Sequence, residues 1–123
     1  MKNNNEEIIS LKQVFNDINF IGTRPSGEII RKKIDEIIAS GKKAIIDFDE
    51  IEGITQSFGD EIIGIYVRFF GVDYIKKNIQ AINYNDEIKT ILNWVVNYSN
   101  EMAEQEIKKC RSYSTNEPAL CVS

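Results

Sequence analysis

The sequence contains no histidine, and it has only two cysteines, two prolines and seven glycines among 123 residues. Without histidine, His-based catalytic triads, the usual proton shuttle near neutral pH and most catalytic zinc sites are excluded. Cys110 and Cys121 lie close together in the sequence and do not form the framework that staples small secreted domains. No apolar run approaches the ~20 residues that span a bilayer, and Met1 to Ser10 is polar and acidic. We therefore expect a cytoplasmic, non-enzymatic protein without a membrane segment, a metal or a cofactor.

Basic residues are fewer than acidic residues. Fifteen Lys and Arg stand against 19 Asp and Glu, which gives a net charge of −4 and no footprint for a phosphate backbone, so a nucleic-acid partner is not expected. The hydrophobic fraction of 42% and charged fraction of 28% are those of an ordinary globular protein. The length suits one domain. We predict a domain at residues 7–109 between flexible segments at 1–6 and 110–123.

The apolar pattern alternates between strands and helices. The segment Ala44–Phe48 has the composition of a strand buried on both faces, and Ile79–Ile82 is a second candidate strand. A short strand followed by a turn or a second element fits Glu6–Phe15. Three amphipathic helices are predicted: from Glu28 to Gly41, from near Ser57 to Gly71, and from Asn85 to about Lys109. This alternation predicts an α/β domain with parallel crossovers.

The segment Gly22–Gly27 carries residue types that a turn alone does not require. Thr23, Arg24, Ser26 and Gly27 bring hydroxyls, a guanidinium and backbone donors to a helix start, where they could hold a phosphate-sized anion. The simpler interpretation is that Thr23 or Ser26 caps the helix and Arg24 pairs with a carboxylate. The segment lacks the Lys and Ser/Thr of a P-loop, which excludes a P-loop NTPase.

A second segment, Thr55–Glu61, includes Gln56, Ser57, Phe58 and Asp60 and opens the second predicted helix. Ser57 precedes the apolar stripe, and Asp60 stands three residues later, which predicts a capping box with Ser57 as the cap. A phosphate on such a hydroxyl is tolerated, because the helix dipole favours negative charge there. Ser57 is therefore both a candidate cap and a candidate phosphoacceptor.

Two further features have a plain and a functional interpretation. Asp47, Asp49, Glu50 and Glu52 supply oxygen ligands for a divalent cation, but their spacing matches no calcium loop, and a solvated loop is favoured. Trp94 and Tyr98 could present an interaction face, although aromatic residues at helical spacing more often belong to a core.

Together, Gly-Thr-Arg-Pro-Ser-Gly at 22–27 and Thr-Gln-Ser-Phe-Gly-Asp-Glu at 55–61 resemble the STAS-like domain family, over roughly Glu7 to Val96. This family is similar to anti-anti-sigma factors, whose sheet has helices on one side. The resemblance implies a single-domain STAS-like sandwich, with a mixed β-sheet and helices mainly on one face.

The anti-anti-sigma switch is a serine at a helix start. With Gly64 matched to the glycine of that helix, Ser57 falls on the phosphoacceptor. Thr55, Gln56 and Phe58 stand where the pattern has Asp, a first Ser and Gly. The resemblance implies a regulatory module that docks on a protein through the surface around Ser57, which includes Asp60 and Glu61. A histidine-kinase-type ATPase is the implied partner.

The alternative function is a small-ligand domain that holds a nucleotide or phosphate at the Arg24 and Ser26 helix start. Two structural expectations accompany these hypotheses. Arg24 should pair with Asp60 or Glu61, because both motifs lie at helix starts and an Arg is best satisfied by a carboxylate. The segment Asp47–Thr55 should connect the central strand to the second helix, at the sheet edge where Ser57 lies.

Overall fold

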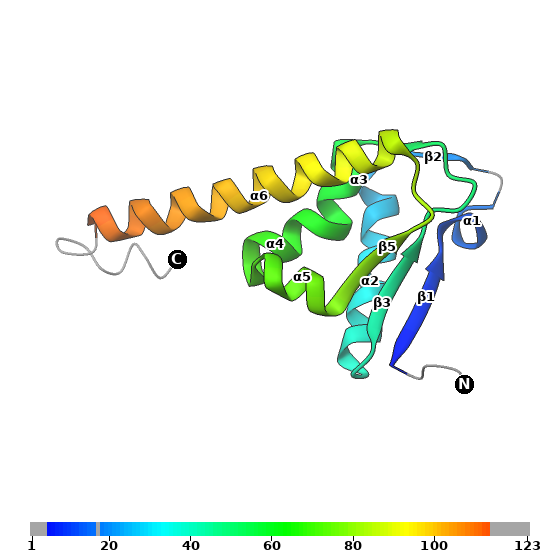
Figure 1. Ribbon diagram of the computed structural model, residues 1–123, viewed down its shortest axis with the longest axis horizontal. Coiled ribbons are helices and arrows are strands. Elements are labelled where there is room, and N and C mark those ends of the chain that lie inside the picture. The colour runs from blue at the N-terminus through cyan, green and yellow to red at the C-terminus, as the bar shows by residue number, and fades with distance from the viewer. Residues whose placement is uncertain (1–4, 17, 114–123) are drawn as a thin grey trace.

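The computed structural model describes residues 5–16 and 18–113, with side chains described as far as residue 103. Strands and helices alternate along the chain (Figure 1): β1 (Glu6–Ser10), α1 (Leu11–Val14), β2 (Phe20–Ile21), α2 (Arg24–Ala39), β3 (Lys43–Asp47), β4 (Gly53–Ile54), α3 (Gln56–Gly59), a π-helix (Asp60–Gly64), α4 (Ile65–Phe70), α5 (Val72–Asn78), β5 (Ile79–Ile82) and α6 (Asp86–Tyr113). The predicted strands at Ala44–Phe48 and Ile79–Ile82 are confirmed.

The larger sheet has the strand order β1-β3-β5, with β3 in the centre. Both of its strand pairs are parallel, so the mixed sheet that we predicted is wrong for the described residues. The reason is the connectivity: each strand is followed by helical segments that carry the chain back before the next strand of this sheet begins, and no hairpin forms.

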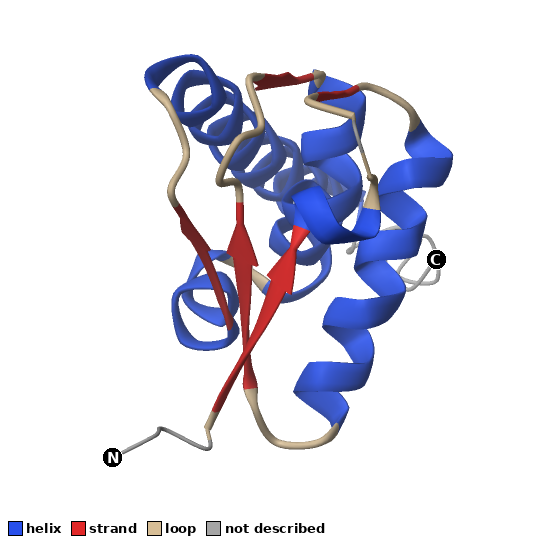
Figure 2. Cartoon of the chain, turned by 90° about the vertical axis from the view of Figure 1, so that its right-hand side faces the viewer, coloured by secondary structure: helices blue, strands red, loops and turns tan. Residues whose placement is uncertain are grey.

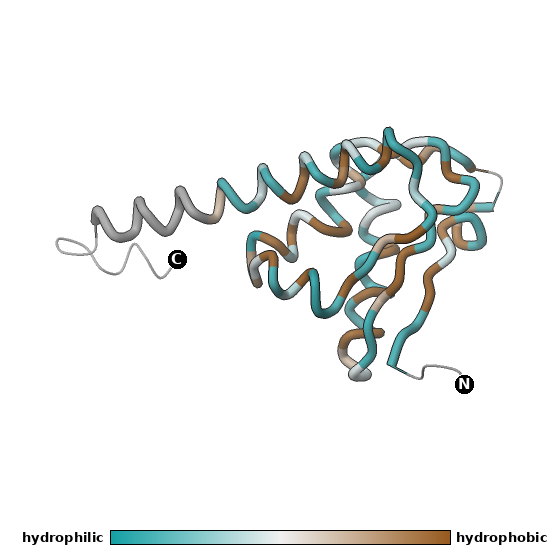
Figure 3. Tube along the Cα trace, viewed as in Figure 1, coloured by the Kyte–Doolittle hydropathy of each residue, from teal (hydrophilic) through white to brown (hydrophobic). Residues whose placement is uncertain are grey.

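One face of the larger sheet packs on the helices. Ile9, Ile46 and Ala81 occupy one row across the three strands, where Ile9 and Ile46 belong to the core and Ala81 packs against it. The next row, on the other face, contains Ile8, which is 61% exposed. Figure 3 shows the apolar residues along the three strands of this sheet. The face that carries Ile9 and Ile46 is therefore the core side of this sheet.

A second, two-stranded sheet positions the two sequence motifs. Strands β2 and β4 pair in parallel, with Phe20 opposite Gly53 and Ile21 opposite Ile54. Figure 2 shows this small sheet at one end of the three longer strands. Because β2 leads into α2 and β4 leads into α3, the pairing brings the two helix starts side by side. The segment Asp47–Thr55 makes the predicted connection from β3 to the second helix.

Helix α2 follows the predicted stripe, with Ile30, Ile34 and Ile37 buried, and the chain turns at Gly41 with a φ of +85°. The second predicted helix is divided into α3, the π-helix and α4, and the sequence pattern missed α5 altogether. Helix α6 continues to Tyr113, past the predicted end near Lys109. No helix in the described part of the chain is long and apolar enough to cross a membrane. Residues 1–4 of the predicted flexible N-terminus, and 114–123 of the predicted tail, lie outside the described residues.

Candidate functional site

The starts of α2 and α3 are built in the same way. Thr23 precedes α2 in extended conformation, and its side chain accepts a hydrogen bond from the Ser26 backbone N–H at 3.2 Å. Thr55 precedes α3 and accepts from the Phe58 N–H at 3.2 Å. Each threonine satisfies one of the free donors of a first helical turn. The Thr55 hydroxyl also donates to the Gly22 carbonyl at 2.9 Å and so ties the two motifs together.

The prediction that Ser57 caps the second helix is wrong. The cap is Thr55, two residues earlier, and Ser57 is the second residue of α3. The predicted capping box fails with it, because the Asp60 carboxylate turns to Arg68 and Arg24. The apolar stripe indicates only which part of the helix is buried. The helix itself begins earlier, at Gln56, which is exposed to solvent.

Helix α2 and the π-helix approach closely at Gly27. A Cβ added to Gly27 would lie 2.5 Å from the Cβ of Glu61, so only glycine fits this crossing. Glu61 is buried, and its carboxylate accepts from Arg24 and Arg31, which lie about one turn before and one turn after Gly27 in α2. The close packing therefore sets the geometry of an ion pair as well as of a helix crossing.

The predicted contact between Arg24 and the second motif is confirmed. Arg24 Nη1 lies 2.7 Å from Glu61 Oε2 and 3.2 Å from Asp60 Oδ2. Asp60 also receives both arms of the Arg68 guanidinium, at 2.5 and 3.3 Å. Three arginines thus share two neighbouring carboxylates, and the fork-shaped Arg68–Asp60 pair is the geometry in which such bonds are strongest.

The arginines control the ionisation of Asp60. Burial raises the pKa of this carboxyl, but the hydrogen bonds and charges of Arg68 and Arg24 outweigh burial and hold the pKa below its usual value. Asp60 therefore stays negative and keeps the two guanidinium groups in place. Arg68 Nη1 reaches on to the buried Ser99 hydroxyl at 3.3 Å, which connects the network to α6.

The π-helix makes room for this network. Asp60 begins it and Gly64 ends it. A Cβ on Gly64 would lie 2.4 Å from Asp60 Oδ1 and 2.9 Å from Ser99 Oγ. Glycine at this position therefore leaves room for the Asp60 carboxylate and the Ser99 hydroxyl to reach Arg68. Single π-turns inside helices are often found at functional sites.

A groove of about 350 Å³ opens beside the network. Trp94 and Tyr98 of α6 stack along one side of it, with ring centroids 4.9 Å apart and planes 7° apart. Both rings are just under half exposed. The groove is lined by Arg24, Gln56, Ser57, Asp60, Arg68, Trp94, Val95, Tyr98, Ser99 and Met102. Ser57 is half-buried, and no described residue forms a hydrogen bond with its hydroxyl.

The predicted switch residues separate into four places. Gln56, Ser57 and Asp60 line the groove. Thr55 caps α3, and Phe58 is fully buried in the core. Glu61 lies beneath Arg24 and Arg31. From the sequence, Trp94 and Tyr98 are either an interaction face or, more often for such spacing, core residues. Arg68 and Ser99 were missed, because nothing in their spacing relates them to the two motifs.

The candidate anion-binding residues are engaged with one another. The Thr23 hydroxyl donates to Ser26 Oγ at 2.8 Å, and the Gly27 N–H donates to the Thr23 carbonyl at 3.2 Å. Arg24 is paired with two carboxylates, although its side chain is 53% exposed. The simpler sequence interpretation, with Thr23 as a cap and Arg24 in an ion pair, describes this helix start.

The acidic run after β3 forms a connecting loop. Asp47 accepts from the Asp49 N–H and from the Asn83 side chain, each at 2.9 Å, and Glu50 pairs with Lys12. In the part of the chain that the structure describes, no three acidic or cysteine side chains gather closely enough to hold a metal ion.

Comparison with known families gives one match. The model of a family described as the STAS-like domain of unknown function (DUF4325) matches residues 26–89. The matched segment contains the whole of the second motif, the π-helix and the start of α6. No curated protein and no solved structure matches the chain.

Proposed function

The chain belongs to the STAS-like domain family, and we propose that it is a non-enzymatic regulatory module that docks on a protein partner through the groove beside Ser57. STAS-like domains are in general regulatory modules rather than enzymes. The observation that carries the proposal is the composition of the groove: Trp94, Tyr98, Arg24 and Arg68 surround Ser57. Trp, Tyr and Arg are the residues that most often dominate binding energy at protein interfaces.

Phosphorylation of Ser57 would act as the switch. A phosphoryl group adds about 1.5 to 2 negative charges and three strong acceptors. At the second residue of α3 it would lie at the positive end of the helix, beside the guanidinium groups of Arg24 and Arg68. It would compete with Asp60 for both arginines and repel the Asp60 carboxylate. Modification would thus rearrange the surface that the partner contacts.

The partner that we propose is a histidine-kinase-type ATPase, on the strength of the resemblance to STAS-like and anti-anti-sigma domains. The alternative is a phosphate or nucleotide site at Thr23, Arg24, Ser26 and Gly27. Docking is favoured over this alternative because the hydroxyls of Thr23 and Ser26 bond to each other and Arg24 already serves two carboxylates.

The test is calorimetric titration of the purified protein with a histidine-kinase-type ATPase from the same organism. Ser57→Asp should weaken binding about 30-fold or more, because it places a charge within the groove, whereas Ser57→Ala should bind within about twofold of the wild type. Trp94→Ala should match the loss of Ser57→Asp. Phe69→Ala is the control, because Phe69 is an aromatic residue, 75% exposed, that does not line the groove.

The variants separate the two parts of the proposal. If Ser57→Asp and Ser57→Ala bind equally well, Ser57 is not a switch. If Trp94→Ala binds like the wild type while Phe69→Ala does not, the docking surface is elsewhere. Thermal melts of each variant distinguish lost binding from lost folding.

A further inference from the structure

A second groove, of about 460 Å³, lies apart from the Ser57 surface, between β5, α5 and α6. Ile79, Gln80 and Ala81, three consecutive residues of β5, line it. Successive side chains of a strand point to opposite faces, so a groove that touches three in a row runs along the edge of the strand rather than over one face. The groove is therefore bounded on one side by the free edge of the three-stranded sheet.

The backbone of β5 offers hydrogen-bonding groups to this groove. The Ile82 carbonyl accepts from the Phe48 N–H at 3.0 Å and so points toward β3. Peptide groups alternate in direction along a strand, which turns the N–H and C=O of Ala81 away from β3 and into the groove. The N–H of Ile79 is already bonded to the Ile75 carbonyl. No described residue pairs with the Ala81 peptide groups, and such a strand edge is a template for another extended chain.

The floor of the groove is apolar. Ile75 of α5, Ala81 of β5, and Leu92 and Val96 of α6 are each half-buried and pack against the core from this side. An apolar side chain on an added strand would cover them and lose its own exposure to water.

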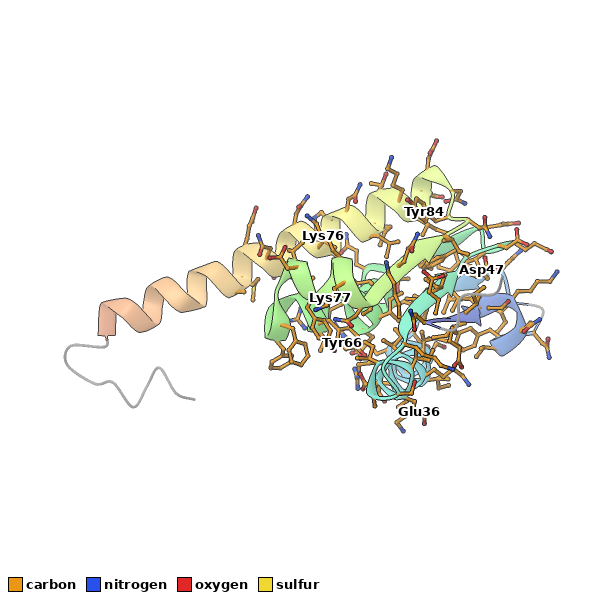
Figure 4. The ribbon with its side chains drawn as sticks, turned by 60° about the horizontal axis from the view of Figure 1, so that its bottom comes forward. Glu36, Asp47, Tyr66, Lys76, Lys77 and Tyr84 are labelled. Atoms are coloured by element: carbon orange, nitrogen blue, oxygen red, sulfur yellow. The ribbon has the colours of Figure 1, made fainter. Side chains whose placement is uncertain are left out.

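The rim is basic. Lys43, Lys76 and Lys89 line the groove with no acidic residue among its lining. None of the three ammonium groups forms an ion pair within the described part of the chain, in a protein whose net charge is −4. Figure 4 shows Lys76 and Tyr84 on the side of β5 that faces α6. The charge complementary to this rim is a carboxylate.

We propose that this groove binds an extended segment of a partner protein in which acidic and apolar residues alternate, as a fourth strand added to β5. The free edge selects an extended backbone, the apolar floor selects the side chains on one face, and the lysines select carboxylates beside them. This site is separate from the Ser57 groove: none of the residues that line one groove lines the other.

The probe for the test is a fluorescein-labelled peptide of about eight residues, roughly 26 Å when extended, that alternates glutamate and valine. Fluorescence anisotropy measures its affinity, and the amide signal of Ala81 reports where it binds. The protein variants are Lys76→Glu/Lys89→Glu and, as a control of equal charge, Lys32→Glu/Lys33→Glu on the exposed face of α2. A second peptide, N-methylated on the side facing β5, removes backbone donors without changing the protein.

The proposal expects saturable binding that shifts the Ala81 amide and slows its hydrogen exchange. Lys76→Glu/Lys89→Glu and peptide N-methylation should each weaken binding about tenfold or more, and the α2 control should weaken it much less. No binding up to about 1 mM, equal loss in both double variants, or no effect of N-methylation would overturn the proposal.

A second copy of this chain is the competing occupant, since β1 also has a free edge and carries Glu6, Glu7 and Ile8. Self-association in sedimentation velocity that both Lys76→Glu/Lys89→Glu and Ile8→Lys abolish would assign the groove to that copy and reject a heterologous partner. Ser57→Asp should leave peptide binding unchanged, so this test does not depend on the proposed function.

Discussion

The cap of α3 provides the most direct test of how the second motif is built. Thr55 makes two contacts with its hydroxyl: it accepts from the Phe58 N–H and donates to the Gly22 carbonyl. Ser57 makes no hydrogen bond with any described residue through its hydroxyl. Thr55→Ala should therefore be destabilising, whereas Ser57→Ala should not.

The magnitude follows from the two contacts. Loss of a helix cap costs about 1 kcal/mol, and loss of a hydrogen bond that leaves a half-buried carbonyl unpaired costs about another 1 kcal/mol. The free energy of unfolding should fall by about 2 kcal/mol in Thr55→Ala, which corresponds to a drop in Tm of about 8 °C for a domain of this size. Ser57→Ala should stay within about 0.5 kcal/mol of the wild type.

Urea denaturation followed by circular dichroism measures both free energies, with Thr55→Ser as the control. Serine keeps the hydroxyl that makes both contacts and lacks only the methyl group. Thr55→Ser should therefore keep most of the free energy of unfolding that Thr55→Ala loses. The reasoning would be refuted if Ser57→Ala lost about 1 kcal/mol while Thr55→Ala lost little, because the helix would then begin at Ser57.

Two further predictions concern the ion network. Gly27→Ala should lower the free energy of unfolding by about 1 to 3 kcal/mol, because the new Cβ would clash with Cβ and Cγ of Glu61. Glu28→Ala, on the exposed face of the same turn, should change the free energy little. Equal Tm values for the two variants would contradict the close approach. Asp60→Asn should destabilise the protein at pH 7 and cost progressively less as the pH falls below 3.8, the ordinary pKa of this carboxyl. Because the pKa of Asp60 is lower in the folded protein than in the unfolded chain, ionised Asp60 contributes its full stability at pH values above the unfolded-chain pKa. That stability is lost as the pH falls through the lower pKa of the folded protein. Urea denaturation at pH 7 and pH 3 checks the trend, and a cost that does not change with pH would contradict it.

Much of the fold follows from local pattern. The isoleucine spacing in α2 marks a buried stripe, and the apolar run before Asp47 marks the central strand, because each depends on a repeat within one element. Arg24 pairs with Asp60 and Glu61 as expected, since a guanidinium at one helix start needs a carboxylate and the second motif supplies two.

Other features depend on contacts between elements and were not predictable from one segment. The division of the second helix by a π-turn depends on Gly64 packing beneath Asp60 and Ser99, which lie 4 and 35 positions away. Its helical periodicity looks the same with or without the turn. The cap at Thr55 depends on its bond to Gly22, across the β2–β4 pair.

The sequence by itself determined the family, the order of the main strands and helices, and the presence of two polar motifs at helix starts, because these are properties of residues close together in the chain. Only the tertiary structure decided that Ser57 is not a cap and that Arg68, Trp94 and Tyr98 share its groove. It also decided that the sheet is entirely parallel in the described residues. The physical reason is the same in each case: a hydrogen bond, an ion pair or a strand pairing joins groups whose separation in the sequence carries no information about their distance in space.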